Sequence, residues 1–400
     1  MKRMNDRRCA VWALVAAALT AAGCAGDAAA RNDALRVDTI GSVVYFRHAA
    51  PAAGDTLQPF VTVGRTMAAE RGSPDEFGRI TSIALGPDGN LFVADAQAHE
   101  IRVFAPTGEF LRGFGRSGEG PGEFLSLYSL AFLGDTLLAM DSGNARISLL
   151  DLAGAPLATW PWYPLTGPVN LGRFYPTGPG EVYTLGLRSG PGPQGPTHIR
   201  LTSGGPGDTL AHPTPEDLPR TSPICPSEGS ISFFSTPFAG QRIAVPAPDG
   251  LLASSWSTDY RIAMTTPAGD TVRVIEREYQ PLPITDAQWE EGTAEYREFR
   301  ERQPGVRCTP ESMTRPAHQA ALQGIYFDEE GRMVVEVTAE GSTRYDFYDA
   351  EGRAAETAYL PVRDVQTVPY FRGRRIAQVT KDELDAQRVE LFDRSATGAR

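Results

Sequence analysis

Internal repetition constrains the fold of this 400-residue chain more than any other feature of its sequence. Residues 87–114 (PDGNLFVADAQAHEIRVFAPTGEFLRGF) align without a gap with residues 248–275 (PDGLLASSWSTDYRIAMTTPAGDTVRVI), at a constant offset of 161. A further copy follows the first at a spacing of 46. The residues that coincide between these two neighbouring copies include Asp95 with Asp141 and Gly108 with Gly154. Repetition at this period predicts one supersecondary unit that packs against copies of itself.

Each copy contains the same series of local signals. A strand is followed by a Pro-Asp-Gly or Gly-Asp turn, an alternating strand, a short loop, another alternating strand, a turn with Gly, and a fourth strand. Four antiparallel strands in about 40 residues are typical of one blade of a β-propeller. Weaker copies follow at residues 172–211, 324–360 and 366–393, and the last of them stops after its third strand.

The strand missing from the last copy is predicted near the start of the chain. Residues 57–65 (LQPFVTVGR) resemble the fourth-strand run of residues 109–116, and residues 73–77 match residues 120–124 at an offset of 47. An N-terminal strand would therefore close the C-terminal blade, and closure removes exposed sheet edges. We expect an all-β, six-bladed β-propeller of four-stranded antiparallel blades. The 41 Gly and 32 Pro fit its many turns.

Three motifs in the first two copies resemble a known family. They are Val-Ala-Asp (Val93–Asp95), Ile-x-Val-Phe (Ile101–Phe104) and Gly-Arg-Ser-Gly-Glu-Gly-Pro-Gly-Glu-Phe (Gly115–Phe124). They resemble bacterial six-bladed β-propeller lipoproteins with NHL-like repeats, and the resemblance covers residues 57–394. The asparagine of the NHL pattern is Asn144 in the second copy, whereas Ala98 stands there in the first. Because the later blades keep the turns and lose most of the signature, the resemblance implies fold more than function.

A short helical insertion is expected between blades four and five, at about residues 280–319. Within it, residues 285–302 (TDAQWEEGTAEYREFRER) begin with a Thr-x-x-Gln capping signal and place three aromatic side chains at helical spacing. Those side chains are Trp289, Tyr296 and Phe299. Gly292 would weaken the helix by about 1 kcal/mol without preventing it. A helix packed on the rim of the propeller and a lid or partner-binding element both remain open.

The first 24 residues have the arrangement of a bacterial secretory signal. A basic start precedes an apolar run of about 13 residues, which is too short to cross a ~30 Å hydrocarbon layer. Leu19–Cys24 (LTAAGC) resembles a lipobox, with Ala21 where Leu is commonest. This resemblance implies acylation of Cys24 and a lipid anchor. Ordinary cleavage to a soluble periplasmic protein is the alternative.

The residue after Cys24 is Ala25, and the absence of Asp there implies an outer-membrane destination, at the periplasmic face or the cell surface. The expected divisions of the chain are a signal peptide at 1–23, a lipidated N-terminus and tether at 24–36, the propeller at 37–394 and a tail at 395–400.

Two cysteines remain for the folded part, Cys225 and Cys308. Both lie in Pro-containing loops, and the periplasm is oxidising, so we expect them to form a disulfide. No paired histidines accompany them, which argues against a zinc site.

The repeated residues are expected to be structural. Asp95 and Asp141 recur at the end of the second strand, where a carboxylate can accept hydrogen bonds from the backbone of the neighbouring turn. Gly108 and Gly154 recur at the turn before the fourth strand. A catalytic group has no reason to occur once in each blade.

No catalytic set emerges from the motifs. The chain has no Gly-x-Ser-x-Gly and no Ser-x-x-Lys, and its five histidines are scattered. Residues 113–118 satisfy Gly-x-Gly-x-x-Gly, but Gly and Pro follow where a dinucleotide site needs a helix. No cofactor is therefore assigned, although a calcium site with oxygen ligands in the central channel stays open, because such ligands leave little trace in a sequence.

Exposed aromatic residues offer candidate binding surfaces. Trp160, Trp162 and Tyr163 cluster with prolines after the second blade, and Trp289 and Tyr296 lie in the insertion. Such a patch could stack on a sugar ring or receive a partner's side chain. Packing between blades is the alternative for the first cluster.

These observations favour a monomeric, non-enzymatic, lipid-anchored binding module for an envelope protein, a peptide or a glycan. A calcium-dependent, lactonase-like hydrolase or lyase is the second hypothesis, and a purely structural envelope protein is the third. The 38 basic and 49 acidic residues give a net charge of −11, which argues against nucleic acid as a partner.

Overall fold

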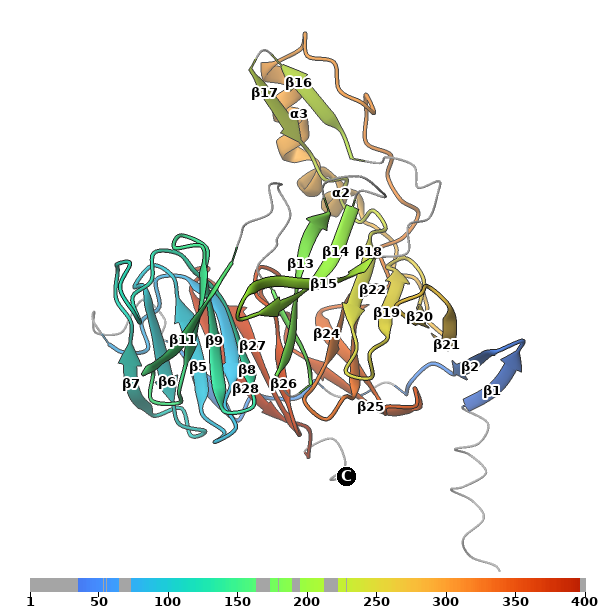
Figure 1. Cartoon of the computed structure of the whole chain (residues 1–400). Coiled ribbons are helices and arrows are strands. Elements are labelled where there is room, and N and C mark those ends of the chain that lie inside the picture. Colours follow the sequence, from blue (N-terminus) through green and yellow to red (C-terminus); the bar gives the residue numbers. More distant parts are fainter. Residues whose placement is uncertain are drawn as a thin grey trace, which may run out of the picture.

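The computed structural model describes residues 35–395, apart from 53, 55, 65–72, 163–172, 179, 189–194, 212–221 and 228. It confirms the six-bladed propeller (Figure 1). Each blade contains four antiparallel strands, the first of which lies at the centre. Blade one contains β4 (Ile80–Leu85), β5 (Leu91–Asp95), β6 (Glu100–Phe104) and β7 (Phe110–Phe114). Blade two contains β8 (Leu127–Leu133), β9 (Thr136–Asp141), β10 (Arg146–Leu150) and β11 (Pro156–Pro161).

The remaining four blades follow in chain order. Blade three contains β12 (Phe174–Gly178), β13 (Glu181–Arg188), β14 (Gly195–Thr202) and β15 (Gly205–Ala211). Blade four contains β18 (Arg242–Pro246), β19 (Leu252–Trp256), β20 (Arg261–Thr265) and β21 (Thr271–Arg277). Blade five contains β22 (Leu322–Phe327), β23 (Met333–Ala339), β24 (Ser342–Tyr348) and β25 (Ala354–Leu360). Blade six contains β26 (Tyr370–Arg372), β27 (Arg375–Lys381), β28 (Gln387–Asp393) and β3 (Val61–Val63).

The ring closes as the sequence predicts, because β3 supplies the outer strand of blade six. It runs antiparallel to β28, and Val61 and Val63 stand opposite Leu391 and Val389. Val63 is buried in a cluster shared by blades six and one. The first and last strands of the propeller are thus held together by both hydrogen bonds and apolar contact.

The repeated glycines have a packing role between blades. Gly108 and Gly154 adopt φ of +85° and +90°, which L side chains rarely do. A Cβ on Gly108 would lie 2.8 Å from Cγ1 of Val61, and a Cβ on Gly154 would lie 2.4 Å from Cγ of Phe114. Each turn therefore presses against the outer strand of the preceding blade, where only glycine fits.

The core lies between blades rather than inside them. Among the described residues, each hydrophobic cluster of the propeller joins two neighbouring sheets. Phe92 of blade one and Phe132 of blade two, for example, pack edge to face with ring centroids 5.1 Å apart. Burial of apolar surface from sheet to sheet around the ring is the main stabilising term of such a fold.

A hairpin that the sequence did not predict precedes the propeller. It consists of β1 (Leu35–Ile40) and β2 (Val43–His48), and β2 pairs in parallel with β21, so the sheet of blade four has six strands. Phe46 enters the cluster between blades four and five, and Nε2 of His48 lies 2.9 Å from the carbonyl oxygen of Gly352. Burial lowers the pKa of His48.

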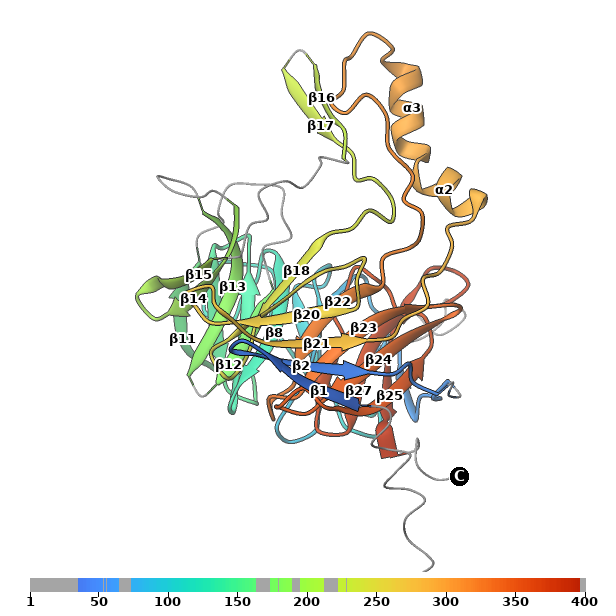
Figure 2. The ribbon, with the colours of Figure 1, turned by 90° about the vertical axis from the view of Figure 1, so that its right-hand side faces the viewer.

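A projecting segment rises from one face of the propeller (Figures 1 and 2). We define it as residues 222–234 and 284–315. It contains β16 (Ile224–Ser227), β17 (Ser230–Phe233), α2 (Asp286–Gly292) and α3 (Ala294–Arg302). A disulfide joins Cys225 to Cys308, with Cα atoms 4.1 Å apart.

The helical insertion is confirmed between blades four and five, but as two helices instead of one. Thr285 and Gln288 form the predicted capping box at the start of α2. The helix ends at Gly292, where a Cβ would lie 2.8 Å from the Pro237 ring, and Thr293 begins α3. Within the part of the chain that the structure describes, no helix has the length and apolar character needed to cross a membrane.

Candidate functional site

The repeated aspartates bind the backbone of neighbouring turns. Both are fully buried. The Asp95 carboxylate accepts hydrogen bonds from the amides of Gly78, Arg79, Gln97 and Ala98. The Asp141 carboxylate accepts them from the amides of Leu125, Ser126, Gly143 and Asn144, and from Nδ2 of Asn144. These contacts join the end of the second strand to the interblade turn and leave neither carboxylate facing a cavity.

The aromatic residues singled out in the sequence lie mainly in cores. Trp162 is buried and Trp160 partly buried in the cluster between blades two and three. Tyr163 lies outside the described residues. Trp160 and Trp162 therefore follow the alternative of packing between blades.

The aromatic residues of the insertion divide in the same way. Tyr296 is buried with Phe299 against Phe234 and the disulfide, and its hydroxyl donates to the carbonyl of Glu311 at 2.7 Å. The ring of Tyr296 thus belongs to the small core of the projecting segment and presents no exposed surface. Trp289 on α2 is partly exposed. The signal peptide and Cys24 lie outside the described residues.

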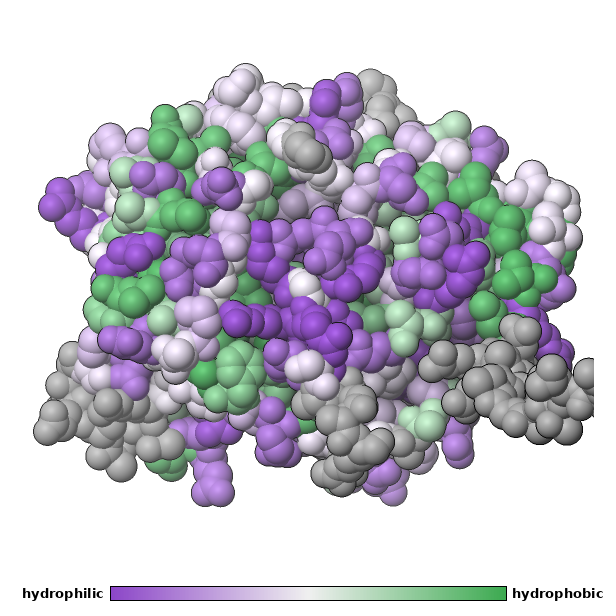
Figure 3. All heavy atoms as spheres, turned by 90° about the horizontal axis from the view of Figure 1, so that it is seen from below, coloured by the Kyte–Doolittle hydropathy of each residue, from purple (hydrophilic) through white to green (hydrophobic). Residues whose placement is uncertain are grey.

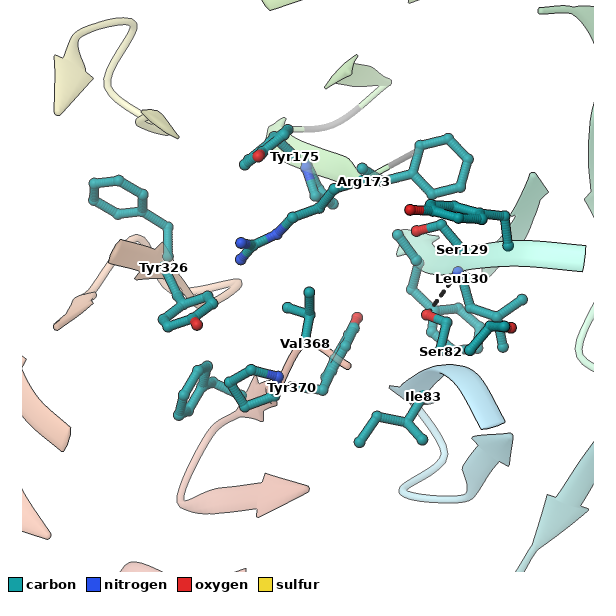
Figure 4. Close-up of a pocket in the computed structure, with 18 of the residues that line it drawn as sticks. Ser82, Ile83, Ser129, Leu130, Arg173, Tyr175, Tyr326, Val368 and Tyr370 are labelled. Carbon is teal, nitrogen blue, oxygen red and sulfur yellow. Dashed lines mark hydrogen bonds between the residues drawn. The ribbon is translucent and has the colours of Figure 1, made fainter. Parts of the chain in front are cut away.

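A cavity of about 590 Å³ lies on the axis of the ring and is lined by the first strand of every blade. Its walls are rich in aromatic side chains, which are Tyr128, Phe132, Phe174, Tyr175, Tyr326, Phe327, Tyr370 and Phe371. Figure 4 looks into this space, where side chains from β4, β8, β12 and β22 converge. A concave site of this volume that combines aromatic walls with polar groups is typical of small-molecule sites.

The axis of the ring also meets the surface on the face opposite the projecting segment. Hydrophilic side chains gather at the middle of that face (Figure 3). Polar and charged groups also line the central cavity, which lies on the same axis.

Two carboxylates line the cavity, and each is paired with an arginine. Asp328 forms an ion pair with Arg332 at 2.7 Å, and Glu329 forms one with Arg372. Burial raises the pKa of Glu329, and Arg372 partly offsets that shift. The negative charge of the wall is therefore largely neutralised by the protein itself.

Arg173 also lines the cavity, but aromatic rings lie beside its guanidinium instead of a carboxylate. It directly precedes β12, and its guanidinium extends towards the middle of the cavity, facing Tyr326 and Val368 (Figure 4). Cζ of Arg173 lies 4.6 Å from the ring centroid of Tyr326 and 5.1 Å from that of Tyr175. Within the described ranges, no hydrogen bond or ion pair joins this guanidinium to another residue.

The two rings beside Arg173 are themselves held in place. The Tyr326 hydroxyl donates to Oε2 of Glu336 at 2.6 Å, and Arg363 donates to both oxygens of that carboxylate at 2.7 and 3.0 Å. Tyr175 packs edge to face on His198 with ring centroids 4.7 Å apart. The position of the guanidinium is therefore set by fixed aromatic faces.

Hydroxyl groups complete the lining. Burial raises the pKa of Tyr370 to about 12, and it also raises the pKa of Tyr128 and Tyr326, so these phenols stay protonated in neutral solution. Ser82 accepts a hydrogen bond from the amide of Leu130 at 2.9 Å, which ties blades one and two beside the cavity. The cavity thus offers aromatic faces, protonated hydroxyls, the guanidinium of Arg173 beside two rings, and the exposed Arg79.

No group of three or more His, Cys, Asp or Glu side chains in the described ranges is arranged to hold a metal ion. A calcium ion on the axis would draw on Asp328 and Glu329, and both already bind arginines.

Sequence reasoning did not find the cavity residues. Arg173, Tyr326 and Val368 lie far apart in the chain and belong to the three weakest copies of the repeat. The available signal was the repeat alignment itself, since the first strand of every blade faces the axis. An arginine at the start of such a strand, followed by Tyr175, would have been the position to single out.

Comparisons with known proteins agree with the fold. The sequence model of a family named DUF5128, described as a 6-bladed beta-propeller, matches residues 75–159. No curated protein sequence matches the chain.

Solved structures match most of the chain, at low sequence identity and with TM-scores of 0.44 or less. A protein of Bacteroides fragilis described as exported has 11% identity and a TM-score of 0.44, and 88% of this chain and 98% of that chain are covered. The PQQ-bound aldose sugar dehydrogenase of Streptomyces coelicolor has 16% identity and a TM-score of 0.42, covering 86% and 99%. A gluconolactonase of Xanthomonas campestris has 12% identity and a TM-score of 0.38, covering 86% and 98%. The family match and the structure together make this chain a six-bladed β-propeller.

Proposed function

We propose that this chain is an exported, lipid-anchored β-propeller that works as a binding module and holds its ligand in the central cavity. One observation supports the site above all: all six blades contribute to a space of about 590 Å³ with aromatic walls and an arginine without an acidic partner among the described residues. Peptide and glycan ends are both small enough to reach such a space. The proposal places binding on the axis and not on Trp160 and Trp162, which pack between blades.

Val368 supplies the test of this site. Its side chain is 37% exposed, stands near the middle of the cavity and precedes β26 (Figure 4). Replacement by Trp would fill the space without removing a buried contact. Val365, three residues earlier in the same loop, is 80% exposed and does not line the cavity, so Val365→Trp is the matched control.

The full chain would be purified from its envelope, dialysed against a low-molecular-mass envelope extract, and analysed for retained compounds by mass spectrometry. We expect the wild type and Val365→Trp to retain the same compound, and Val368→Trp to retain none. Equal retention by all three forms would place the site elsewhere. No saturable retention by any form would favour the purely structural alternative.

The same protein tests the calcium-dependent alternative. Removal of a metal that binds the native state lowers the melting temperature. The binding proposal involves no such metal, so it predicts that EDTA changes the melting temperature by less than about 1 °C. A large decrease that calcium reverses would favour the hydrolase or lyase.

The address is part of the proposal and rests on residues 1–24. Cys24→Ser should move the protein from the membrane fraction to the soluble periplasmic fraction, because one acyl-modified cysteine is the expected anchor. Unchanged fractionation would contradict the lipid anchor but not the proposal that the cavity binds a ligand.

A further inference from the structure

The charged groups that line the cavity are not all paired with one another. The lining carboxylates Asp328 and Glu329 have arginine partners, whereas Arg173 has none among the described residues. The chain as a whole carries a net charge of −11. A protein with a negative net charge thus points into this cavity an arginine that has no acidic partner among the described residues.

The contacts that Arg173 makes with the described residues leave its hydrogen-bonding capacity unused. Tyr175 and Tyr326 lie at cation–π distances, which favour the positive charge but consume no N–H group. A guanidinium has five N–H donors in a planar fork, and that fork matches the two oxygens of a carboxylate. In a partly desolvated cavity such a donor set is stabilised by an anion that accepts two parallel hydrogen bonds.

The support behind the two rings indicates preorganisation. Tyr326 is fixed by Glu336, and Arg363 in turn holds Glu336 with two hydrogen bonds. The guanidinium therefore meets an incoming ligand without first having to order the residues beside it, which lowers the cost of binding. Tyr326 is a positioning residue in this arrangement.

The lining of the cavity indicates what the rest of the ligand should be. Aromatic side chains surround the guanidinium, and the phenols of Tyr326 and Tyr370 stay protonated. A flat body with apolar faces would stack on such rings, and one negative charge would match the guanidinium that the two rings flank. A phosphate monoester carries nearly two charges, which is more than the guanidinium of Arg173 alone would balance.

Resting on the proposed function, we infer that the cavity binds a ligand that carries a carboxylate on a flat ring, and that Arg173 holds this carboxylate through its N–H edge. Aromatic acids make up this class. The carboxylate is the feature that the protein distinguishes.

The test uses 2-naphthoate, 2-naphthamide and 2-naphthyl phosphate as probes, titrated against the full-length protein by fluorescence. We expect the wild type to bind 2-naphthoate at least about tenfold more tightly than 2-naphthamide, since hydrogen bonds to charged groups exceed neutral ones by about that factor. Arg173→Gln should remove this preference and leave the affinity for 2-naphthamide within about twofold. Arg173→Lys should restore only part of it, because the planar fork is lost.

Arg79→Gln is the matched control. Arg79 also lines the cavity, so the variant removes the same charge from the same space, but Arg79 is exposed, whereas Arg173 is partly buried beside two rings. It should change the affinity for 2-naphthoate by less than about threefold. An effect as large as that of Arg173→Gln would show general charge attraction and overturn the assignment of Arg173.

The outcomes separate the inference from the proposed function. Binding of both 2-naphthoate and 2-naphthamide that Val368→Trp abolishes and Arg173→Gln leaves unchanged would overturn the inference and keep the cavity as the site. Tighter binding of 2-naphthyl phosphate than of 2-naphthoate would overturn the carboxylate assignment. Absence of binding of any probe to the wild type would overturn the inference, and only the dialysis experiment would then decide the proposed function.

Discussion

At the scale of single residues, charged side chains have different roles in this propeller according to their partners. Asp95 and Asp141 are fully buried and saturated with backbone hydrogen bonds. Arg173 faces a cavity, and its guanidinium has no hydrogen bond or ion pair with any described residue. Repetition along the chain identifies the first kind, and only the assembled ring identifies the second.

The repeated aspartates should be important for stability. Asp141→Ala would leave several buried amide donors without acceptors, and we expect it to lower the free energy of unfolding by about 3 kcal/mol. Asp88→Ala, in the exposed turn where Asp88 accepts from the amide of Asn90, should cost less than about 1 kcal/mol. Urea unfolding followed by fluorescence measures both, and equal costs would contradict the structural role.

Buried phenols predict an alkaline limit to stability. Burial raises the pKa of Tyr370 to about 12, above the value near 10 that the unfolded chain would have. The folded state therefore prefers the protonated phenol, and its contribution is complete below pH 10 and is lost as the pH rises to about 12. Urea unfolding from pH 8 to 12 should show this loss, and Tyr370→Phe should make the decline shallower. An identical decline in the variant would contradict the assignment.

At the scale of elements, the sequence predicted those that repeat and missed those that do not. The capping box of Thr285 and Gln288 and the closing strand β3 follow from local chemistry and from self-similarity. The hairpin β1–β2 could not be predicted in place, because its parallel pairing with β21 joins segments more than 200 residues apart. The projecting hairpin β16–β17 has no counterpart in the repeat.

The projecting segment should behave as a unit that depends on its disulfide. Cys225 and Cys308 are separated by 83 residues, and their link is worth about 4 kcal/mol in the chain-entropy model. Replacing both by Ala should reduce amide hydrogen-exchange protection in β16, β17 and α3 and leave the blades protected. Ile231→Ala, at an exposed position of the same hairpin, should change neither. Simultaneous loss of protection in the blades would show that the segment is not independent.

The closing strand β3 should contribute more to stability than strand β1 of the hairpin that precedes the propeller. Thr62→Pro removes an amide from β3, whose residues pair with β28, and we expect a loss of about 3 kcal/mol or more. Thr39→Pro makes the same change in β1, whose residues are largely exposed, and should cost much less. Thermal unfolding of the two variants gives the comparison, and a reversed order would contradict closure as the source of stability.

At the scale of the whole molecule, the fold was predictable because a propeller repeats one pattern, and turns such as Pro87-Asp88-Gly89 recur at matching positions. The site was not predictable in the same way. Each blade contributes one strand to the axis, so the cavity is a property of the ring, and residues such as Arg173 and Tyr326 meet only after six blades have closed. The tryptophans attracted attention as surface aromatics, yet Trp162 fills space between blades.

The central claim is that ligands bind on the axis of the ring. Photo-crosslinking in the native envelope tests it most directly, with p-benzoylphenylalanine placed at Val368 in one form and at Phe233, exposed on the projecting segment, in another. The account predicts a small-molecule adduct at position 368 and the same background as an unmodified control at position 233. A protein partner crosslinked at position 233, with no adduct at position 368, would contradict the account and move the working surface to the projecting segment.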